Sequence, residues 1–239
     1  MTRINLWSSP RNISTALMYS FAQRADTTVV DEPLYAYYLM HTDTLAEHPG
    51  TAEILRSQSP NSEQVIQHVL NAPYSTSVAV FKQMTHHILP DLRQDFMLSM
   101  ANVLLIRDPR RIIASYTKVI DQPTIADIGV QQQYELYQFL QQNDCLTAIV
   151  DAQKLLEQPR VVLTKLCDRL GINFTERMLS WSAGARKEDG VWAKHWYANV
   201  HQSTGFQPYV AKNVQLSPPM EELATKCKTY YEYLLLQAL

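Results

Sequence analysis

Glycine is scarce in this chain, which has 6 glycines among 239 residues and none before Gly50. The phosphate-binding loop of ordinary ATPases and GTPases has the pattern GxxxxGK[ST], whose glycines let the backbone wrap around a phosphate. That pattern is absent from the sequence. The sequence therefore argues against a nucleoside triphosphatase of the usual kind.

Cysteine is scarce as well. Cys145, Cys167 and Cys227 are odd in number, lie far apart and form no CxxC pair. We interpret them as reduced, mostly buried thiols of a cytosolic protein. The one adjacent histidine pair is His86-His87, and neighbouring side chains on a helix point in different directions. We therefore expect no bound metal ion.

Long apolar runs and a strong excess of one charge are also absent. No run approaches the roughly 20 apolar residues that a bilayer span needs, and the first residues show no signal-peptide pattern. The net charge is −2 and the pI about 6.4, so neither nucleic acid nor a membrane is indicated as a partner. We expect a cytoplasmic protein that holds any anionic ligand at a local site.

Short apolar runs alternate with longer periodic ones, a pattern typical of βα units and a parallel sheet. We expect strands near residues 4–7, 27–30, 77–81, 103–106 and 147–150. We expect helices near residues 13–24, 61–71, 110–120, 131–142, 159–170 and 221–236. Gly171 would end the fifth of these helices, and residues 42–60 would form a loop with short helices. No linker or repeat interrupts the chain, which predicts one domain over residues 1–239, rich in loops and aromatic side chains from about residue 182.

Charged residues gather where the expected strands end. Arg11 follows the first strand, and Asp31 and Glu32 follow the second. Lys82 follows the third strand and Arg107 the fourth. Because ligands of open α/β sheets bind outside the carboxyl ends of the strands, we expect the functional site at this edge.

The segment between the first strand and the first helix holds the parts of an anion site. The first N–H groups of a helix have no internal partner, and the helix dipole favours a negative charge in front of them. Arg11 adds a charge and a forked donor, and Ser14 and Thr15 add hydroxyls. The alternative is simple capping of the helix by Ser9 or Asn12.

The stretch Pro10-Arg11-Asn12-Ile13-Ser14-Thr15 resembles the 5′-phosphosulfate loop of sulfotransferases, P-[KR]-S-G-T-T. In that family the basic residue and the hydroxyls grip the 5′-phosphate and the sulfuryl group of 3′-phosphoadenosine 5′-phosphosulfate (PAPS). The resemblance gives these roles to Arg11, Ser14 and Thr15. Ile13 stands where the family has glycine.

A second stretch, Arg107-Asp108-Pro109 with Ser115 eight residues after Arg107, matches the family's 3′-phosphate motif R-[DN]-P-x5-S. The resemblance makes Arg107 and Ser115 ligands of the 3′-phosphate. Taken alone, such an arginine is often an ion-pair partner, and a serine within a helix often has no special role. Two motifs in the family's order, each between a strand and a helix, are more specific than either alone.

The resemblance extends from residue 4 to about residue 180 and includes a structural region at residues 150–171. Residues 7–24 and 31–39 are most similar to the sulfotransferase-like domain fused to aminotransferase-like proteins. Ser203 and Gly205 lie where many members have a late glycine loop against the 3′-phosphate, although the pattern K-G-x-x-G-x-W is missing. These two residues complete the expected donor site.

The resemblance implies a three-layer α/β fold of the P-loop type with a central parallel sheet. It also implies transfer of a sulfuryl group from PAPS to a hydroxyl or amine of a small-molecule acceptor, without a metal. Two alternatives stay open. One is a P-loop nucleotide-dependent kinase, which would need a Walker-type lysine and a Mg²⁺ ligand, and the other is a non-catalytic nucleotide-binding relative.

The general base stays open at this point. Glu32 follows the second strand, as in sulfotransferases that use a glutamate base, but it could also be only an ion-paired carboxylate. Other members use the histidine of a K-T-H sequence, where this chain has Lys82-Gln83-Met84 followed by His86 and His87.

Other side chains near the expected site also have two interpretations. Lys82 could contact the sulfuryl oxygens or pair with Asp31 or Glu32, while Arg11 is expected to stabilise the leaving phosphate. The tyrosines of Tyr35–Tyr38 and the aromatic residues after Ser182 could line or cover an acceptor pocket, or could be packed core.

Overall fold

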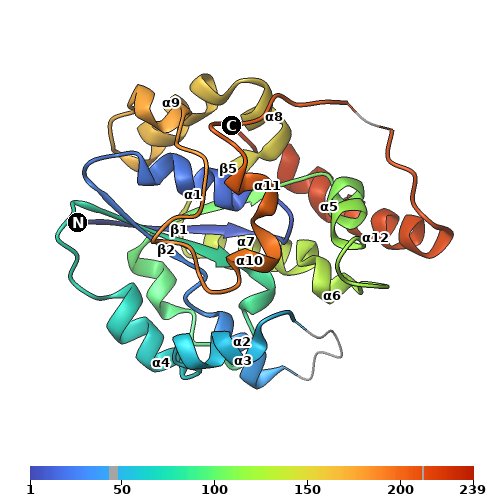
Figure 1. Ribbon diagram of the computed structural model, residues 1–239, viewed down its shortest axis with the longest axis horizontal. Helices are drawn as coiled ribbons and strands as arrows, with labels where there is room; N and C mark the ends of the chain where they lie inside the picture. Colours follow the sequence, from blue (N-terminus) through green and yellow to red (C-terminus); the bar gives the residue numbers. More distant parts are fainter. Residues whose placement is uncertain (43–47, 212) are drawn as a thin grey trace.

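A computed structural model describes residues 1–42, 48–211 and 213–239 of the chain. It shows a parallel sheet between two layers of helices (Figure 1). In the described part the sheet order is β2-β3-β1-β4-β5, and every neighbouring pair is parallel. The strands are β1 (Thr2–Ser8), β2 (Thr27–Asp31), β3 (Val78–Met84), β4 (Ala101–Ile106) and β5 (Leu146–Asp151). The predicted three-layer α/β architecture is confirmed.

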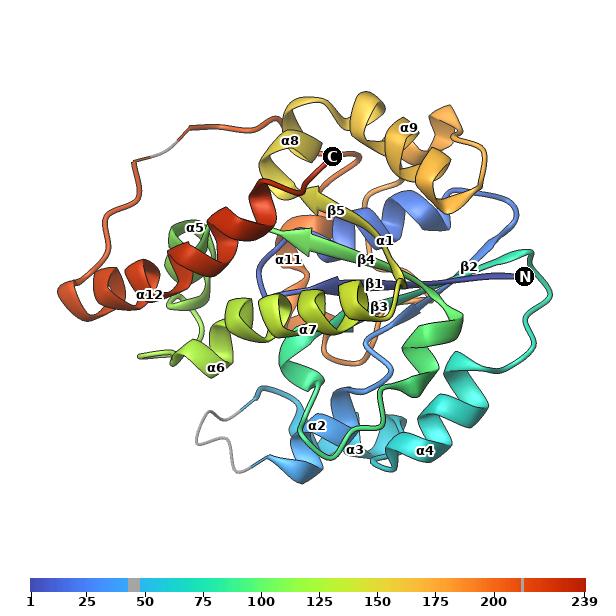
Figure 2. The ribbon, with the colours of Figure 1, turned by 180° about the vertical axis from the view of Figure 1, so that it is seen from behind.

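Successive side chains of each strand point to opposite faces of the sheet, so the core has one cluster of buried side chains on each face. On β3, Val78 and Val80 contribute to one cluster of buried side chains, and Ala79 and Phe81 contribute to the other. The helices that pack on the first cluster are α1 (Ser14–Ala22), α8 (Ala152–Glu157) and α9 (Pro159–Leu170). The second face is covered by α7 (Val130–Gln142) and α12 (Pro218–Leu235), as Figure 2 shows. Because both faces are covered, the strands are apolar on both sides.

The main helices lie near their predicted positions and differ at their ends. α9 ends at Gly171, whose φ of 66° lies in the left-handed region, as predicted. Helix α5 (Pro109–Tyr116) begins after Asp108, whose carboxylate accepts a hydrogen bond from Arg110 N at 2.9 Å. It ends four residues before the predicted boundary at residue 120.

The other helical elements are short. The expected helix at residues 61–71 is α4 (Ser62–Val65) followed by a π-helical turn (Ile66–Leu70). The remaining ones are α2 (Tyr35–His41), α3 (Thr51–Ser57), α6 (Ile125–Ile128), α10 (Ala193–Trp196), α11 (Ala198–His201) and 3-10 turns at Thr85–His87, Asp95–Ser99 and Glu176–Leu179. Within the expected loop at 42–60, residues 43–47 lie outside the described residues.

Strand β3 is longer than predicted, so Lys82 lies within the strand rather than after it. The strand continues through Gln83 and Met84, which pair with Trp7 and Ser8 of β1. Lys82 is tolerated within the strand because its buried ammonium group is paired with Asp31, the last residue of β2, and with Glu32, which follows it.

No helix among the described residues has both the length and the apolar character needed to cross a bilayer.

Candidate active site

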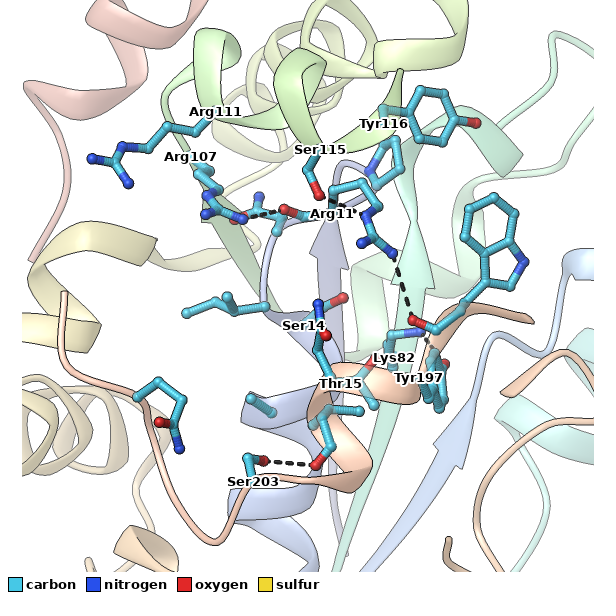
Figure 3. Close-up of a pocket in the computed structure, with 18 of the residues that line it drawn as sticks. Arg11, Ser14, Thr15, Lys82, Arg107, Arg111, Ser115, Tyr116, Tyr197 and Ser203 are labelled. Carbon is cyan, nitrogen blue, oxygen red and sulfur yellow. Dashed lines mark hydrogen bonds between the residues drawn. The ribbon is translucent and has the colours of Figure 1, made fainter. Parts of the chain in front are cut away.

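A pocket of about 580 Å³ lies at the carboxyl ends of β1, β2, β3 and β4 (Figure 3). Its lining includes the residues that the sequence analysis assigned to donor binding or catalysis: Pro10, Arg11, Asn12, Ile13, Ser14, Thr15, Glu32, Lys82, His86, Arg107, Ser115, Ser203 and Gly205. Residues up to 195 positions apart in sequence, Pro10 and Gly205, thus share one cavity, while their roles stay predictions.

The N-terminus of α1 has no side-chain cap. The residue at the cap position is Ile13, and neither Ser9 nor Asn12 accepts a hydrogen bond from the first turn, as the capping interpretation would require. The Asn12 amide instead donates to Ser9 Oγ at 3.1 Å and to Leu105 O at 2.5 Å. Since Ser14 lines the pocket, the unsatisfied N–H groups of this helix are available to an anion there.

Backbone strain gathers at the pocket. Arg11, Ile13 and Glu32 have φ values of 57°, 52° and 38°, in the left-handed region. Placing a residue with a Cβ in this region destabilises the folded state by on the order of 1–3 kcal/mol, and residues strained in this way cluster at functional sites. Ile13 therefore keeps the left-handed conformation that a glycine at this position would adopt freely.

Three arginines, Arg11, Arg107 and Arg111, line the pocket. Arg11 Nε donates to Ser115 Oγ at 3.0 Å, and its Nη1 lies 3.5 Å from Trp196 O. Arg107 Nη1 donates to Arg11 O at 2.5 Å, as Figure 3 shows. Burial lowers the pKa of Arg107, and the charges of Arg111 and Arg11 lower it further. Among the described residues, none of these three guanidinium groups forms an ion pair with a carboxylate.

Arg111 was missed by the sequence analysis, although it lines the pocket. Its guanidinium lies over the Tyr209 ring, 4.4 Å from the centroid, and donates to Val210 O at 3.1 Å. Arg111 lies in the first turn of α5, and Arg107 precedes that helix by two residues. Its position just after the junction between β4 and α5 was the signal that could have identified it.

Lys82 is at the centre of a buried polar network and is 1% exposed. Its Nζ donates to Asp31 Oδ1 at 2.8 Å, to Tyr197 OH at 2.9 Å and to Glu32 Oε1. Burial alone would lower the pKa of Lys82, but the charges of Asp31 and Glu32 raise it well above its ordinary value. Of the two interpretations of Lys82, pairing with these carboxylates is the one that the structure shows.

The candidate bases differ in their electrostatic environments. Burial raises the pKa of Glu32. The positive charge of Lys82 lowers this pKa, and the negative charge of Asp31 raises it, so that the net shift is upward. Burial lowers the pKa of His86 to about 3, and His48 and Lys82 lower it further. His87 is fully buried outside the pocket lining, stacked on the ring of Tyr35 at 4.9 Å. Glu32 therefore binds protons more readily than an ordinary carboxylate, whereas His86 is neutral.

The aromatic residues divide between the pocket and the core. Tyr35 lines the pocket, whereas Tyr37 lies outside the lining and donates to Asp91 Oδ1 at 2.6 Å. After Ser182, Trp192, Trp196 and Tyr197 line the pocket. Of these, Trp192 is 2% exposed and also belongs to a packed aromatic cluster. The segment thus closes one side of the pocket and is packed core as well.

Ser203 and Gly205 lie on the last part of this segment. Ser203 Oγ accepts from Trp181 Nε1 at 3.1 Å and donates to Val200 O at 2.7 Å. Gly205 pairs with Ser180 in an isolated antiparallel bridge. Both residues therefore fix the segment against the body of the protein as well as lining the pocket.

Residues 2–220 match the family model for the sulfotransferase domain. A relative from Arabidopsis thaliana, branched-chain-amino-acid aminotransferase-like protein 1, is 41% identical over 203 residues, which are 85% of this chain and 36% of the relative. The chain thus spans little more than a third of the length of that relative.

Two solved structures have the same fold at low sequence identity. The sulfotransferase domain of the Synechococcus PCC 7002 olefin synthase matches with a TM-score of 0.55 and 20% identity over 95% of this chain and 94% of that chain. Mouse sulfotransferase SULT7A1, solved in complex with PAP, matches with a TM-score of 0.53 and 10% identity over 100% of this chain and 90% of that chain. The family match covers nearly the whole chain and agrees with this fold, so the chain belongs to the sulfotransferase domain family.

Proposed function

We propose that the protein transfers a sulfuryl group from PAPS to a hydroxyl or amine of a small-molecule acceptor and releases PAP. The observation that carries this proposal is that Arg11, Arg107 and Arg111, without carboxylate partners in the described residues, line the same pocket as the uncapped N-terminus of α1. Like charges that repel one another are stabilised by a ligand with several negative charges. PAPS and PAP are ligands of that kind.

The two ends of the donor fit different parts of this cationic surface. The first N–H groups of α1, with Arg11 and the hydroxyls of Ser14 and Thr15, would hold the 5′ side. Arg107 and Ser115 would hold the 3′-phosphate, and Arg111, which lines the same pocket, would assist. In the structure, Arg11 donates a hydrogen bond to the Ser115 hydroxyl, and a phosphate oxygen could replace Ser115 as the acceptor.

Bound PAPS supplies a sulfuryl group already joined to a phosphate leaving group. Arg11 would stabilise the negative charge that develops on that phosphate. Glu32 would accept the proton of the acceptor, since its raised pKa makes it a stronger base than an exposed carboxylate. His86 fits this role less well, because a group with a pKa of about 3 is a weak base.

The first test is calorimetric titration with PAP, with 5′-AMP and with ATP plus Mg²⁺. We expect PAP to bind far more tightly than AMP, because only PAP carries the 3′-phosphate. Arg107→Ala should weaken PAP binding by about 2 kcal/mol, roughly thirtyfold, and should weaken AMP binding far less. Tight binding of ATP with Mg²⁺ instead would favour the kinase alternative.

The matched control is Arg110→Ala, since Arg110 is the neighbour of Arg111 but pairs with Glu221 and lies outside the pocket lining. It should leave PAP binding unchanged. A folded protein that does not bind PAP would rule out the proposed donor. Binding of PAP without transfer from labelled PAPS to any of a panel of phenols, alcohols and amines would favour the non-catalytic alternative.

A further inference from the structure

Asp31 is a buried carboxylate just behind the pocket and is not part of its lining. Its side chain is 1% exposed. One oxygen, Oδ1, accepts from Lys82 Nζ at 2.8 Å, and the other, Oδ2, accepts from Tyr197 OH at 2.7 Å and from Gly190 N at 3.2 Å. Two of these donors come from the segment that closes the pocket. Asp31 is therefore fully engaged and cannot contact a ligand in the pocket.

The partners of Lys82 show what Asp31 does to the adjacent Glu32. The ammonium group can donate three hydrogen bonds, and it donates them to the carboxylates of Asp31 and Glu32 and to the hydroxyl of Tyr197. Two buried carboxylates thus share one buried cation. If both are ionised, the trio carries a net charge of −1, and that excess charge favours binding of one proton.

We propose that Asp31 is a positioning residue that divides the charge of Lys82 between two carboxylates and so keeps Glu32 able to take a proton from the acceptor. This inference rests on the proposed function, in which Glu32 is the base. With Asp31 neutral, Lys82 would pair with Glu32 alone. Glu32 would then be a tightly paired carboxylate and a weaker base.

The groups around Glu32 support this assignment. Lys82 on β3 attracts its negative charge and Asp31 on β2 repels it, and both act on its pKa. Tyr35 on α2, Tyr116 on α5 and Tyr197 each have a pKa raised by burial and, to a smaller extent, by Glu32, so all three hydroxyls stay neutral at ordinary pH. Asp31 is thus the second negative charge that raises the proton affinity of Glu32.

The test is Asp31→Asn, which removes the charge and keeps the size of the side chain. In the protein without donor, the carboxyl carbon of Glu32 is followed by ¹³C NMR in glutamate-labelled protein and is identified by its loss in Glu32→Gln. We expect its titration midpoint to move to lower pH. The acidic limb of the kcat profile should move in the same direction, and the plateau kcat should fall by about tenfold or more because the base is weaker.

The matched control is Asp189→Asn. Asp189 anchors the same segment, with a side chain 5% exposed that accepts from Tyr19 OH at 2.6 Å and from Arg186 N at 2.8 Å. This control should loosen the segment without moving the midpoint of Glu32. An unmoved midpoint in Asp31→Asn, or an equal movement in both variants, would overturn the proposal.

A second variant covers the case in which Asp31→Asn does not fold. Asp31→Ser also removes the carboxylate, so the Glu32 midpoint should again move to lower pH, and an unmoved or raised midpoint would contradict the proposal. A failure of the proposed function can be told apart from a failure of this inference. In that case the wild-type protein would transfer no sulfuryl group, whereas the NMR titration would still report whether Asp31 controls the proton affinity of Glu32.

Discussion

At the scale of single residues, Ile13 stands out because its backbone has a conformation that suits glycine. Ile13 is at the cap position of α1 and has a φ of 52°. Its partly buried side chain packs against the core cluster that α1, α8 and α9 cover. The loop therefore balances backbone strain against side-chain packing. Replacements at this position can separate the two contributions.

We predict that Ile13→Gly is more stable than Ile13→Ala by about 1 kcal/mol. Both variants lose the packing of the isoleucine, so their difference reports the strain of a Cβ at positive φ. The measurement is the free energy of unfolding in urea. At Ala16, within α1, Ala16→Gly provides the control, because there glycine should destabilise by roughly 0.5–1 kcal/mol. If Ile13→Ala is the more stable of the pair, the loop is not strained as described.

The pocket position of the residues in the two motifs could be predicted from the sequence, because each motif lies between a strand and a helix, while their roles stay predictions. Arg11 and Arg107 illustrate this, since a strand followed by a helix fixes where such side chains point. The network around Lys82 could not be predicted in this way. Tyr197 and Asp31 are 166 residues apart, and their contact depends on the path of a segment without periodicity.

At the scale of elements, strands were the most predictable because their apolar runs are buried on both faces. Their ends were harder to place. Lys82, Gln83 and Met84 continue β3 because tertiary partners satisfy the buried Lys82. Helix α2 was not predicted, since its Tyr35–Tyr38 stretch has no clear helical period and its conformation depends on packing.

The bridge between Ser180 and Gly205 is an element whose importance can be measured. A Cβ on Gly205 would lie 2.9 Å from Leu179 O, so the backbone would have to move. We predict that Gly205→Ala destabilises the segment that closes the pocket by about 1–3 kcal/mol and leaves the sheet intact. Hydrogen exchange should then rise around residues 180–206 but not in β1 or β4.

The comparison variant is Gly171→Ala. A Cβ at Gly171 meets no atom within 4 Å, so only the positive φ opposes alanine there. This variant should cost about 1 kcal/mol and should affect the end of α9 rather than the closing segment. Equal exchange patterns in the two variants would show that the bridge does not hold the segment.

At the scale of the whole molecule, buried histidines should make stability depend on pH. Burial lowers the pKa values of His48, His86 and His87, that of His86 to about 3. Between about pH 6.5 and 3 the unfolded chain therefore binds protons that the folded protein does not. The stability from these groups is present above pH 6.5 and is lost as the pH falls, while Glu32, with its raised pKa, acts in the opposite sense.

We predict that the free energy of unfolding decreases as the pH is lowered from 6.5 to 5. His87→Phe should flatten this decrease by up to roughly 1.4 kcal/mol per pH unit, since it removes one buried group. The measurement is urea unfolding at a series of pH values. Replacement of the exposed His68 by glutamine is the control and should leave the slope unchanged. A slope that His87→Phe does not alter would place the acid sensitivity elsewhere.

The position of β1 has a consequence for how the protein is made. β1 is the first of the described strands along the chain, yet it is the middle strand of the sheet, between β3 and β4. On the ribosome, both of its edges stay unpaired until Val78–Met84 and Ala101–Ile106 have been synthesised. Unpaired apolar strands are prone to aggregate. Residues 10–15, which follow β1 and line the pocket, therefore cannot reach their final surroundings until β3 and β4 have been made.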